Sequence, residues 1–472
     1  MNNTSAKVRR VSTSTVFPAT QKKRTTQKIE LSPMDFRPFR RLYAQSGLLF
    51  AKPRTTSDSR ESIQEETNKI LSNLKSSLSQ TLDYFFPLAG CLTVTKHDDD
   101  GTISVYINCN SAGVEFIHAV ADVTIAVLLK PTYTPDIIDS FFTFDGIRNY
   151  EGVSLPLLSV QVTVLTDGIF VAFSSNHSVC DGTSFSNFIN SWSQISRGIT
   201  HKLHPPVILK PRWLPRQTNF PIRLPFSSIE ELTVEKFIPS PELRQKKFHF
   251  TPQNVAKLKE KAHNGYGTTF SSLQVVSANV WVAVTRARQL HPNVNVTYAC
   301  AINTRDRLDP PLPKGYFGNS VLRGLATAKA GELLEKGLSF GASLINHMVK
   351  SCTNDEIHRN WESWVENPVM PSSLDLLSST NVAVGGSPKF NIHSIDFGWG
   401  APLVSRYGSN YRSEGLIMAD AGPVNNGVIT IGICLPFEIL RALENDVEFM
   451  ETVCTVLPPE YSTTKIEPLS NL

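Results

Sequence analysis

The stretch His177-Ser-Val-Cys-Asp181-Gly182 constrains the fold most, because it lies between an apolar hairpin and a helix. Residues 158–165 and 169–176 are rich in β-branched and aromatic residues and are separated by an Asp-Gly turn, which predicts a β-hairpin. After it, apolar residues recur at helical spacing: Phe185, Phe188, Ile189, Trp192 and Ile195. We therefore expect His177 where a buried strand gives way to a helix, a place that holds a side chain rigidly beside a cavity.

His177 and Asp181 each have two interpretations. A histidine followed four residues later by a carboxylate is typical of a base with its support, and Gly182 leaves room for a substrate. A histidine beside apolar strands is also often an ordinary core residue. Aspartate is favoured at a helix N-cap, because its carboxylate accepts free backbone N–H groups. The spacing alone leaves both interpretations open.

A second motif, Asp396-Phe-Gly398-Trp399-Gly400, follows the run 388–395. Each glycine costs roughly 0.5–1 kcal/mol inside a regular helix or strand, so this pentapeptide needs a reason in its backbone conformation. Together, the H-x-x-x-D-G and D-F-G-W-G motifs resemble those of the plant BAHD acyltransferases, which transfer an acyl group from coenzyme A to an alcohol or amine.

The resemblance extends over nearly the whole chain. Four further segments are similar to the family's: Leu31-Ser-Pro-Met-Asp35, Tyr84-Phe-Phe-Pro-Leu-Ala-Gly90, Asn303-Thr-Arg305-Asp-Arg307 and Tyr316-Phe-Gly-Asn319. The segment 130–181 further resembles a subgroup of uncharacterised acetyltransferase-like members. At 385–387, Gly-Gly-Ser stands where hydroxycinnamoyl-transferring relatives often have bulkier residues, so the resemblance does not identify an acceptor.

The resemblance implies an α/β fold of two similar domains, each with a mixed β-sheet flanked by helices. It implies that His177 is the general base and that acyl-CoA reacts directly with the acceptor, without a covalent acyl-enzyme. Asp181 would pair with Arg305, and Asp396, Gly398 and Trp399 would shape the backbone rather than react. Acyl-CoA would be a co-substrate, with no permanently bound cofactor and no metal.

Ser271 and Ser272 precede a predicted helix and are candidate contacts for a phosphate of coenzyme A. The family has polar residues there, and a helix N-terminus attracts anions. An ordinary serine cap is the alternative interpretation.

The chain of 472 residues is expected to form two domains, 1–200 and 236–472, joined by a proline-rich crossover linker at 201–235. We predict helices at 62–81, 252–264 and 271–288, and one continuous helix over 326–350. Predicted strands are 8–16 at a sheet edge, 102–108, 294–302, 390–396 and 427–435.

Composition narrows the class of protein. The net charge is only +4 and much of it lies on the N-terminal arm, which argues against nucleic-acid binding. No apolar run is long enough to cross a membrane. Seven scattered cysteines without a C-x-x-C pair indicate a reducing compartment. We expect a cytoplasmic monomer that binds acyl-CoA and a small acceptor. The basic, Ser/Thr-rich N-terminus leaves a plastid open, and the C-terminal Ser-Asn-Leu leaves a peroxisome open.

Two other motifs predict different chemistry and are set aside. Gly337-Leu-Ser339-Phe-Gly341 matches a serine-hydrolase elbow, but it lies inside a predicted helix. The run Asp98-Asp-Asp-Gly101 lacks the later ligands of a calcium loop and is typical of a hairpin turn. The alternative function is a base-catalysed lyase or other non-transfer enzyme on the same fold, with His177 as base. A non-catalytic binding protein is a third hypothesis, but an intact His177 would have no chemical purpose in it.

Overall fold

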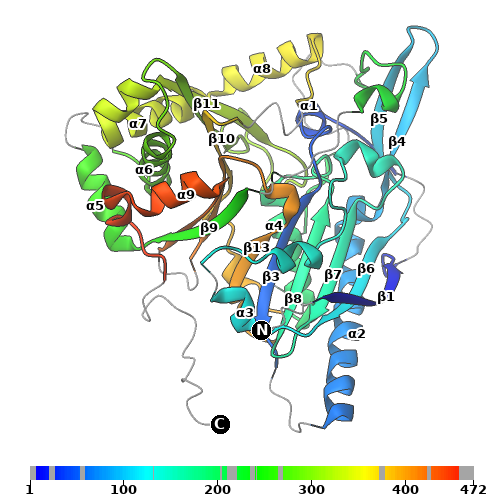
Figure 1. Ribbon diagram of the computed structural model, residues 1–472. Helices are drawn as coiled ribbons and strands as arrows, with labels where there is room; N and C mark the ends of the chain where they lie inside the picture. The colour runs from blue at the N-terminus through cyan, green and yellow to red at the C-terminus, as the bar shows by residue number, and fades with distance from the viewer. Residues whose placement is uncertain are drawn as a thin grey trace.

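The computed structural model describes residues 7–20, 27–53, 59–130, 132–201, 203, 205–209, 220–233, 240, 242–263, 269–371, 378–422 and 427–456. Two lobes lie side by side, each built on a six-stranded sheet (Figure 1). Parallel and antiparallel pairs occur in both sheets, so both are mixed. The α/β fold with two mixed sheets flanked by helices, predicted from the resemblance, is confirmed.

The first sheet and a small neighbouring sheet lie in one lobe. The strands of the first sheet, in spatial order, are β1 (Val8–Val16), β6 (Val114–Ala121), β7 (Leu158–Val164), β8 (Gly168–Ser175), β3 (Ala44–Ala51) and β13 (Val404–Tyr407). The small sheet has the order β2 (Gln27–Glu30), β5 (Thr102–Cys109) and β4 (Cys91–His97). The helices of this half of the chain are α1 (Pro33–Phe36), α2 (Arg60–Tyr84), α3 (Ile125–Leu129) and α4 (Gly182–Ser196).

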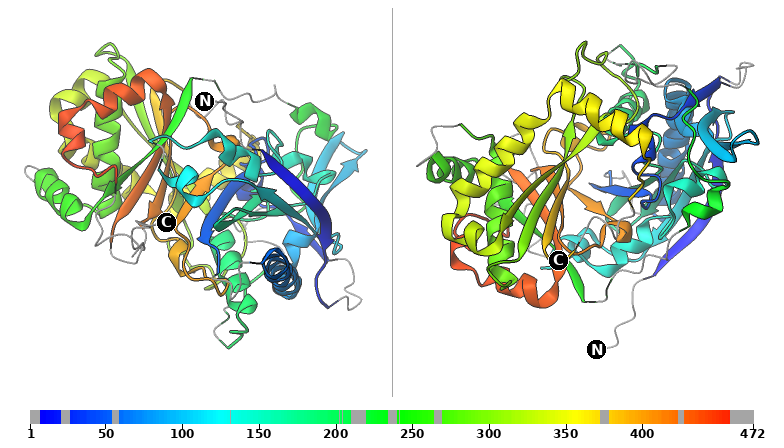
Figure 2. Two further views of the ribbon diagram at one scale, coloured as in Figure 1. Left: turned by 60° about the horizontal axis from the view of Figure 1, so that its bottom comes forward. Right: turned by 90° about the horizontal axis from the view of Figure 1, so that it is seen from above.

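The second lobe contains the other six-stranded sheet. Its strands, in spatial order, are β11 (Val321–Lys329), β10 (Asn295–Asn303), β12 (Asn381–Gly386), β14 (Leu416–Ala421), β15 (Ile429–Pro436) and β9 (Leu243–Phe250). Its helices are α5 (Pro252–His263), α6 (Ser272–Ala287), α7 (Ala330–Ser351), α8 (Asn354–Glu366), α9 (Phe437–Glu444) and α10 (Val447–Met450). The two further views in Figure 2 show this lobe beside the first sheet.

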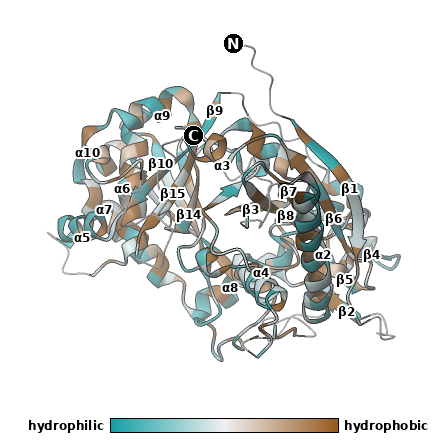
Figure 3. Cartoon of the chain, turned by 90° about the horizontal axis from the view of Figure 1, so that it is seen from below, coloured by the Kyte–Doolittle hydropathy of each residue, from teal (hydrophilic) through white to brown (hydrophobic). Residues whose placement is uncertain are grey.

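Strand β8 is buried on both faces. This burial fixes the end of the strand, and His177 follows directly after that end. Phe173 packs toward α2 and α4, where its ring meets Trp192 at a centroid distance of 6.0 Å. Phe170 packs on the opposite face, in the cluster that includes α3. Full burial of such a side chain stabilises a fold by about 1.5–3 kcal/mol, so β8 cannot shift by one residue without losing both faces. Hydrophilic and hydrophobic residues alternate along α2, as expected for a helix covering a sheet (Figure 3).

Strand β13 links the two lobes. It comes from the C-terminal half of the chain but pairs antiparallel with β3 of the first sheet. Its Ser405 hydroxyl donates to Asp420 on β14 at 2.7 Å, and Lys247 on β9 donates to the Ser405 carbonyl at 2.8 Å. The backbone of β13 therefore pairs in the first sheet, while its Ser405 also bonds to Asp420 and Lys247 of the second sheet. The domain limits 1–200 and 236–472 stay a prediction, and much of 201–235 lies outside the described residues.

Most of the predicted elements are present. The hairpin before His177, the helix after it, the edge strand β1 and the turn at 98–101 are confirmed. In the turn, Asp100 accepts hydrogen bonds from the backbone and hydroxyl of Thr102. Helices α2, α5 and α6 and strands β5, β10 and β15 also lie at the predicted places, with ends shifted by a few residues. Position 264 lies outside the described residues.

Two predicted elements are wrong. Residues 390–396 form no strand, only a 3₁₀ turn at Ile392–Ser394, because β12 ends at Gly386 and Pro388 cannot donate a ladder hydrogen bond. Residues 326–329 belong to β11 rather than to a helix. Pairing with β10 overrides the helix propensity of its alanines.

The helix that follows β11 is interrupted. Gly337 has φ 62° and ψ −147° inside α7, a backbone conformation that essentially only glycine adopts. Gly341, one turn further on, has no positive φ, and a Cβ there would lie in ordinary contact, 3.4 Å from the nearest side chain. Helix α7 is therefore two helical segments joined at Gly337.

The interruption predicts opposite effects of two glycine substitutions in one helix. Gly337→Ala should lower the free energy of unfolding by about 1–3 kcal/mol, because alanine is strained at that φ. Gly341→Ala should be neutral or stabilise by up to about 1 kcal/mol. Denaturant unfolding of both variants measures this, and stabilisation by both would show that α7 is continuous.

None of the helices within the described residues is both long and apolar enough to cross a membrane.

Candidate active site

Asn176 shapes the turn that carries His177 out of β8. Its side-chain amide donates to the Tyr43 hydroxyl at 3.1 Å and to the Asn149 carbonyl at 2.7 Å. Its Oδ1 accepts the backbone N–H of Ser178 at 3.0 Å. Since Asn176 is fully buried, these bonds set where the next residue begins.

The backbone of His177 is held from both sides. Its N–H donates to Asn149 Oδ1 at 2.8 Å, and its carbonyl accepts Asn319 Nδ2 at 2.9 Å. The half-buried ring lies near the positive charge of Arg41. Burial first, and then this charge, lower the pKa of His177 below its usual value of 6.5. The imidazole is therefore neutral near pH 7 and able to accept a proton.

Asp181 and Arg305 form a buried, bidentate ion pair. Arg305 Nη1 donates to Asp181 Oδ2 at 2.8 Å, and Arg305 Nη2 donates to Asp181 Oδ1 at 2.9 Å. The same carboxylate accepts the backbone N–H of Ser184 at 3.0 Å, as the N-cap of α4, and that of Ser320 at 2.9 Å. Both interpretations of Asp181, the helix cap and the partner of Arg305, thus describe its contacts. None of these four bonds comes from His177.

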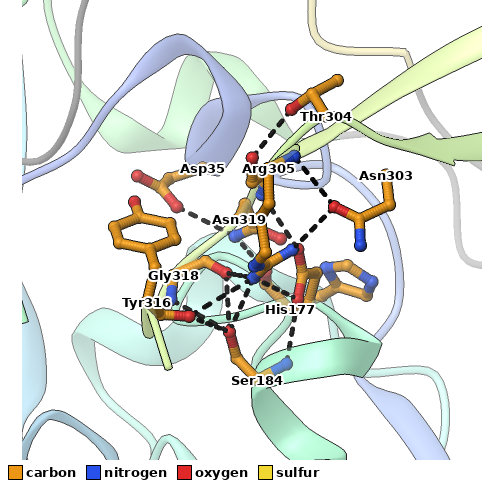
Figure 4. A network of polar contacts seen from close by, with 11 residues as sticks. Asp35, His177, Ser184, Asn303, Thr304, Arg305, Tyr316, Gly318 and Asn319 are labelled. Atoms are coloured by element: carbon orange, nitrogen blue, oxygen red, sulfur yellow. Dashed lines mark hydrogen bonds and ion pairs between the residues drawn. The ribbon is translucent and has the colours of Figure 1, made fainter. Parts of the chain in front are cut away.

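A second polar link joins the N-terminal segment to the same turn. Asn319 Nδ2, which donates to the His177 carbonyl, also donates to Asp35 Oδ1 at 2.9 Å. The other Asp35 oxygen accepts the N–H and hydroxyl of Ser32 at 2.8 and 2.7 Å. Asp35 is fully buried. Figure 4 shows Asn319 between Asp35 and His177. The segments at 35, 177 and 319 are therefore fixed to one another.

The space left by the missing side chain of Gly182 is occupied by the ring of Phe390. A Cβ at Gly182 would lie 2.8 Å from Cε2 of Phe390, too close for an undisturbed ring. Phe390 belongs to the loop after β12, so glycine here lets a C-terminal aromatic side chain approach the start of α4. The room expected beside His177 is thus partly filled by this ring.

The D-F-G-W-G motif lies at the other end of α4. Asp396 Oδ1 accepts the backbone N–H groups of Gly398 and Gly400 at 2.7 and 2.9 Å, and both glycines have positive φ, of 102° and 91°. The second oxygen pairs with Arg197 at 3.4 Å, just past the C-terminal end of α4. A helix of 15 residues is about 22 Å long, so Asp396 lies far from Asp181 at its start.

Aromatic packing explains the rest of the motif. Phe397 meets Trp192 at a centroid distance of 4.8 Å, and Trp399 meets Phe50 of β3 at 5.5 Å. The motif therefore closes one end of the first sheet, and its next residues enter β13. The contacts of Asp396 and Trp399 and the positive φ of Gly398 thus shape the backbone of this segment.

Ser271 is the N-cap of α6. Its hydroxyl accepts the N–H of Gln274 at 3.3 Å, and its own N–H donates to Gln274 Oε1 at 2.8 Å. The serine cap is thus present, and Ser272 is the first helical residue. Contact of either serine with coenzyme A stays a prediction.

The geometry gives little support to a serine hydrolase or to a metal site. The Ser339 hydroxyl donates to the carbonyl of Lys261 at 3.3 Å, on α7 rather than on a strand-to-helix elbow. Among the described residues, no group of three or more His, Cys, Asp or Glu side chains could hold a metal. A surface cavity of about 300 Å³ lies elsewhere, and no residue lining it bonds to His177; its lining is Arg40, Phe226, Pro368, Val369, Met370 and Pro371.

Sequence reasoning missed the residues that hold His177. Asp35 and Asn319 lie in segments that resemble the family's. The sequence therefore singled out their positions but did not predict that they hold His177. Asn149 and Arg41 had no local signal, because their contacts with the histidine turn depend on the tertiary fold.

Comparison with known proteins agrees with the motifs. A model described as "Transferase family" matches residues 6–450. An uncharacterised acetyltransferase of Arabidopsis thaliana is 36% identical over 449 residues, covering 93% of this chain and 98% of the relative. BAHD acyltransferase DCR of the same plant is 32% identical over 397 residues, covering 81% of each chain.

The fold is also similar to that of a solved structure. F. graminearum TRI101 complexed with coenzyme A and T-2 mycotoxin has a TM-score of 0.72 and 18% identity, covering 90% of this chain and 99% of that chain.

The chain belongs to the Transferase family, as a BAHD acyltransferase. It is an acyl-CoA-dependent acyltransferase.

The buried pair predicts a coupled loss of stability. Asp181→Ala and Arg305→Ala should each lower the free energy of unfolding by roughly 3–5 kcal/mol, because either leaves an uncompensated buried charge. The double variant should lose less than the sum, which a double-mutant cycle in urea measures.

The exposed pair between Arg359 and Glu356 is the matched control, expected to change stability by under about 1 kcal/mol. Strict additivity at Asp181 and Arg305 would contradict the proposed coupling.

Proposed function

We propose that this protein moves an acyl group from acyl-CoA to the hydroxyl or amine of a small acceptor, with His177 as general base. The observation that carries the proposal is the position of His177, whose backbone is fixed by Asn149 and Asn319 and whose burial lowers the pKa of its imidazole. A positioned base of this kind accelerates proton transfer by about 10²–10⁴-fold.

In the proposed reaction, the imidazole takes the proton of the acceptor O–H or N–H as that atom attacks the thioester carbonyl. The tetrahedral intermediate then expels the thiolate of coenzyme A, which takes the proton back from the imidazolium. Aligning acceptor and thioester supplies much of the remaining acceleration. No acyl-enzyme forms, and acyl-CoA is the co-substrate.

Asp181 and Arg305 support this chemistry without entering it. Within the part of the chain that the structure describes, the four hydrogen bonds to the Asp181 carboxylate come from Arg305, Ser184 and Ser320, so the pair ties the start of α4 to the segment before β11. Asn319 lies one residue before Ser320 and holds the His177 carbonyl. We propose that the pair acts by keeping this donor in place.

The remaining expectations stay proposals. The protein would work as a monomer in the cytoplasm, with no nucleic-acid partner and no resident metal, and Ser271 and Ser272 would contact coenzyme A. The domain limits 1–200 and 236–472 are also proposals.

Replacing the proposed base gives the first test. His177→Ala should lower acyl transfer at least about 10²-fold, while thermal unfolding and calorimetric binding of coenzyme A stay close to wild type. Release of free thiol from acetyl-CoA in the presence of a panel of hydroxyl and amine acceptors measures the transfer.

Ser339→Ala, which removes the hydroxyl of the serine-hydrolase-like motif, is the control and should keep full transfer. Near-wild-type transfer by His177→Ala would rule out the base. If wild-type protein showed no saturable binding of coenzyme A, a lyase on the same fold would be favoured.

A further inference from the structure

Two positively charged side chains meet where β13 lies against the second sheet. Lys247 of β9 donates from Nζ to the Ser405 carbonyl at 2.8 Å, and Arg406 of β13 donates from Nη1 to the same oxygen at 3.3 Å. Arg406 Nη2 donates to the Leu128 carbonyl at 3.0 Å. These acceptors are neutral carbonyl groups, so the bonds hold the two cations side by side without neutralising either charge.

One carboxylate faces these two positive charges. Asp420 Oδ2 lies 3.9 Å from Lys247 Nζ, beyond hydrogen-bond distance, and accepts the Ser405 hydroxyl at 2.7 Å. Its Oδ1 accepts the Tyr407 hydroxyl. Among the described residues, the positive charges at this contact therefore exceed the negative charges by one.

The other charged side chains around this contact pair with one another. Lys246 forms an ion pair with Glu444. Arg412 forms ion pairs with Asp136 at 3.0 Å and with Asp139 at 2.9 Å. The side chain of Asp136 is 83% exposed, so water and salt screen its charge. These groups therefore do not supply a counter-charge to the contact.

Burial makes the surplus charge costly. Arg406 is 8% exposed, and its buried Nε has no hydrogen-bond partner among the described residues. The side chain of Lys247 is 17% exposed, and burial followed by the Arg406 charge lowers its pKa to about 7, which Asp420 opposes. Burial also lowers the pKa of the neighbouring His249 and His393, so both are neutral at pH 7. Charges that lose their hydration need compensation from other groups.

A cavity of about 20 Å³ lies at the same contact, and Lys247, Arg406, Tyr411 and Gly432 are among the residues that line it. A single water molecule needs at least about 10–15 Å³ of such space, so the cavity has room for one particle of that size. A Cβ at Gly432 would lie 3.8 Å from the Met418 carbonyl oxygen and 3.9 Å from Lys247 Cγ. The cavity wall at Gly432 is therefore open enough for a methyl group.

We propose that Lys247 and Arg406 bind one chloride-sized anion between the two lobes. One negative charge would balance the surplus positive charge, and charges attract each other more strongly in a protein interior than in water. The ammonium of Lys247 and the guanidinium of Arg406 supply the N–H donors. Because Lys247 belongs to the second sheet and β13 pairs in the first, the anion stabilises the contact between the lobes. The inference does not depend on the proposed acyl transfer.

Thermal unfolding in sodium chloride and in sodium gluconate, at equal ionic strength, tests the site. Chloride fits the cavity, whereas gluconate is too large. The wild-type Tm should rise with chloride along a saturable curve, by at least about 2 °C relative to gluconate. The reason is that a ligand bound only by the folded protein stabilises it by mass action.

Two variants remove the site in different ways. Arg406→Gln removes one charge, and Gly432→Ala places a methyl group in the cavity without a steric clash. Both should lose the chloride-dependent rise in Tm. Gly432→Ala should also unfold at or slightly above the wild-type Tm in gluconate, so the test remains decisive if Arg406→Gln does not fold.

Arg288→Gln is the matched control, because the side chain of this arginine is also buried but already pairs with Glu414 at 3.2 Å. It should lower the Tm in both salts and keep the chloride-dependent rise. A rise that persists in Arg406→Gln and Gly432→Ala would be a general salt effect and would overturn the proposal. Equal wild-type Tm values in the two salts would overturn it as well.

Crystals grown in sodium bromide locate the ion directly. An anomalous peak between Lys247 Nζ and the Arg406 guanidinium supports the site. Density for a water molecule there, without an anomalous signal, overturns it.

Discussion

The buried pair of Asp181 and Arg305 is the contact on which the site depends. Asp181 caps α4 while Arg305 comes from the segment that leads into β11, so one ion pair joins the two lobes four residues after His177. Removing two charges from water is costly, and the full set of hydrogen bonds to this carboxylate offsets that cost. The pair thus specifies one relative position of the histidine turn and the Asn319 segment.

Strand β13 provides a second constraint between the lobes. Its backbone completes the first sheet beside β3, while Ser405 bonds to Asp420 and Lys247 of the second sheet. The D-F-G-W-G turn immediately before it packs on Phe50 and Trp192. A motif far from His177 can therefore matter for activity by fixing how the two sheets meet.

Local patterns predicted the hairpin, the histidine position and the helix after it, because alternation and helical spacing depend on neighbouring residues. They failed at 326–329, where pairing with β10 outweighs alanine's helix propensity, and at 390–396, where Pro388 prevents a strand. The pair of Asp181 with Arg305 was predictable only through the family resemblance. Asn149 and Arg41 were not predictable at all, since their contacts depend on the tertiary fold: Asn149 bonds to His177, 28 residues away, and to the carbonyl of Arg41, more than a hundred residues away.

The central claim is that the fold holds His177 as a neutral base, and an NMR titration of its imidazole tests this most directly. Burial and the nearby Arg41 charge lower its pKa, so the ring should gain a proton only below the ordinary value of about 6.5 and be uncharged at pH 7. His177→Ala assigns the signal. An imidazolium at pH 7, with a pKa above 6.5, would contradict the account.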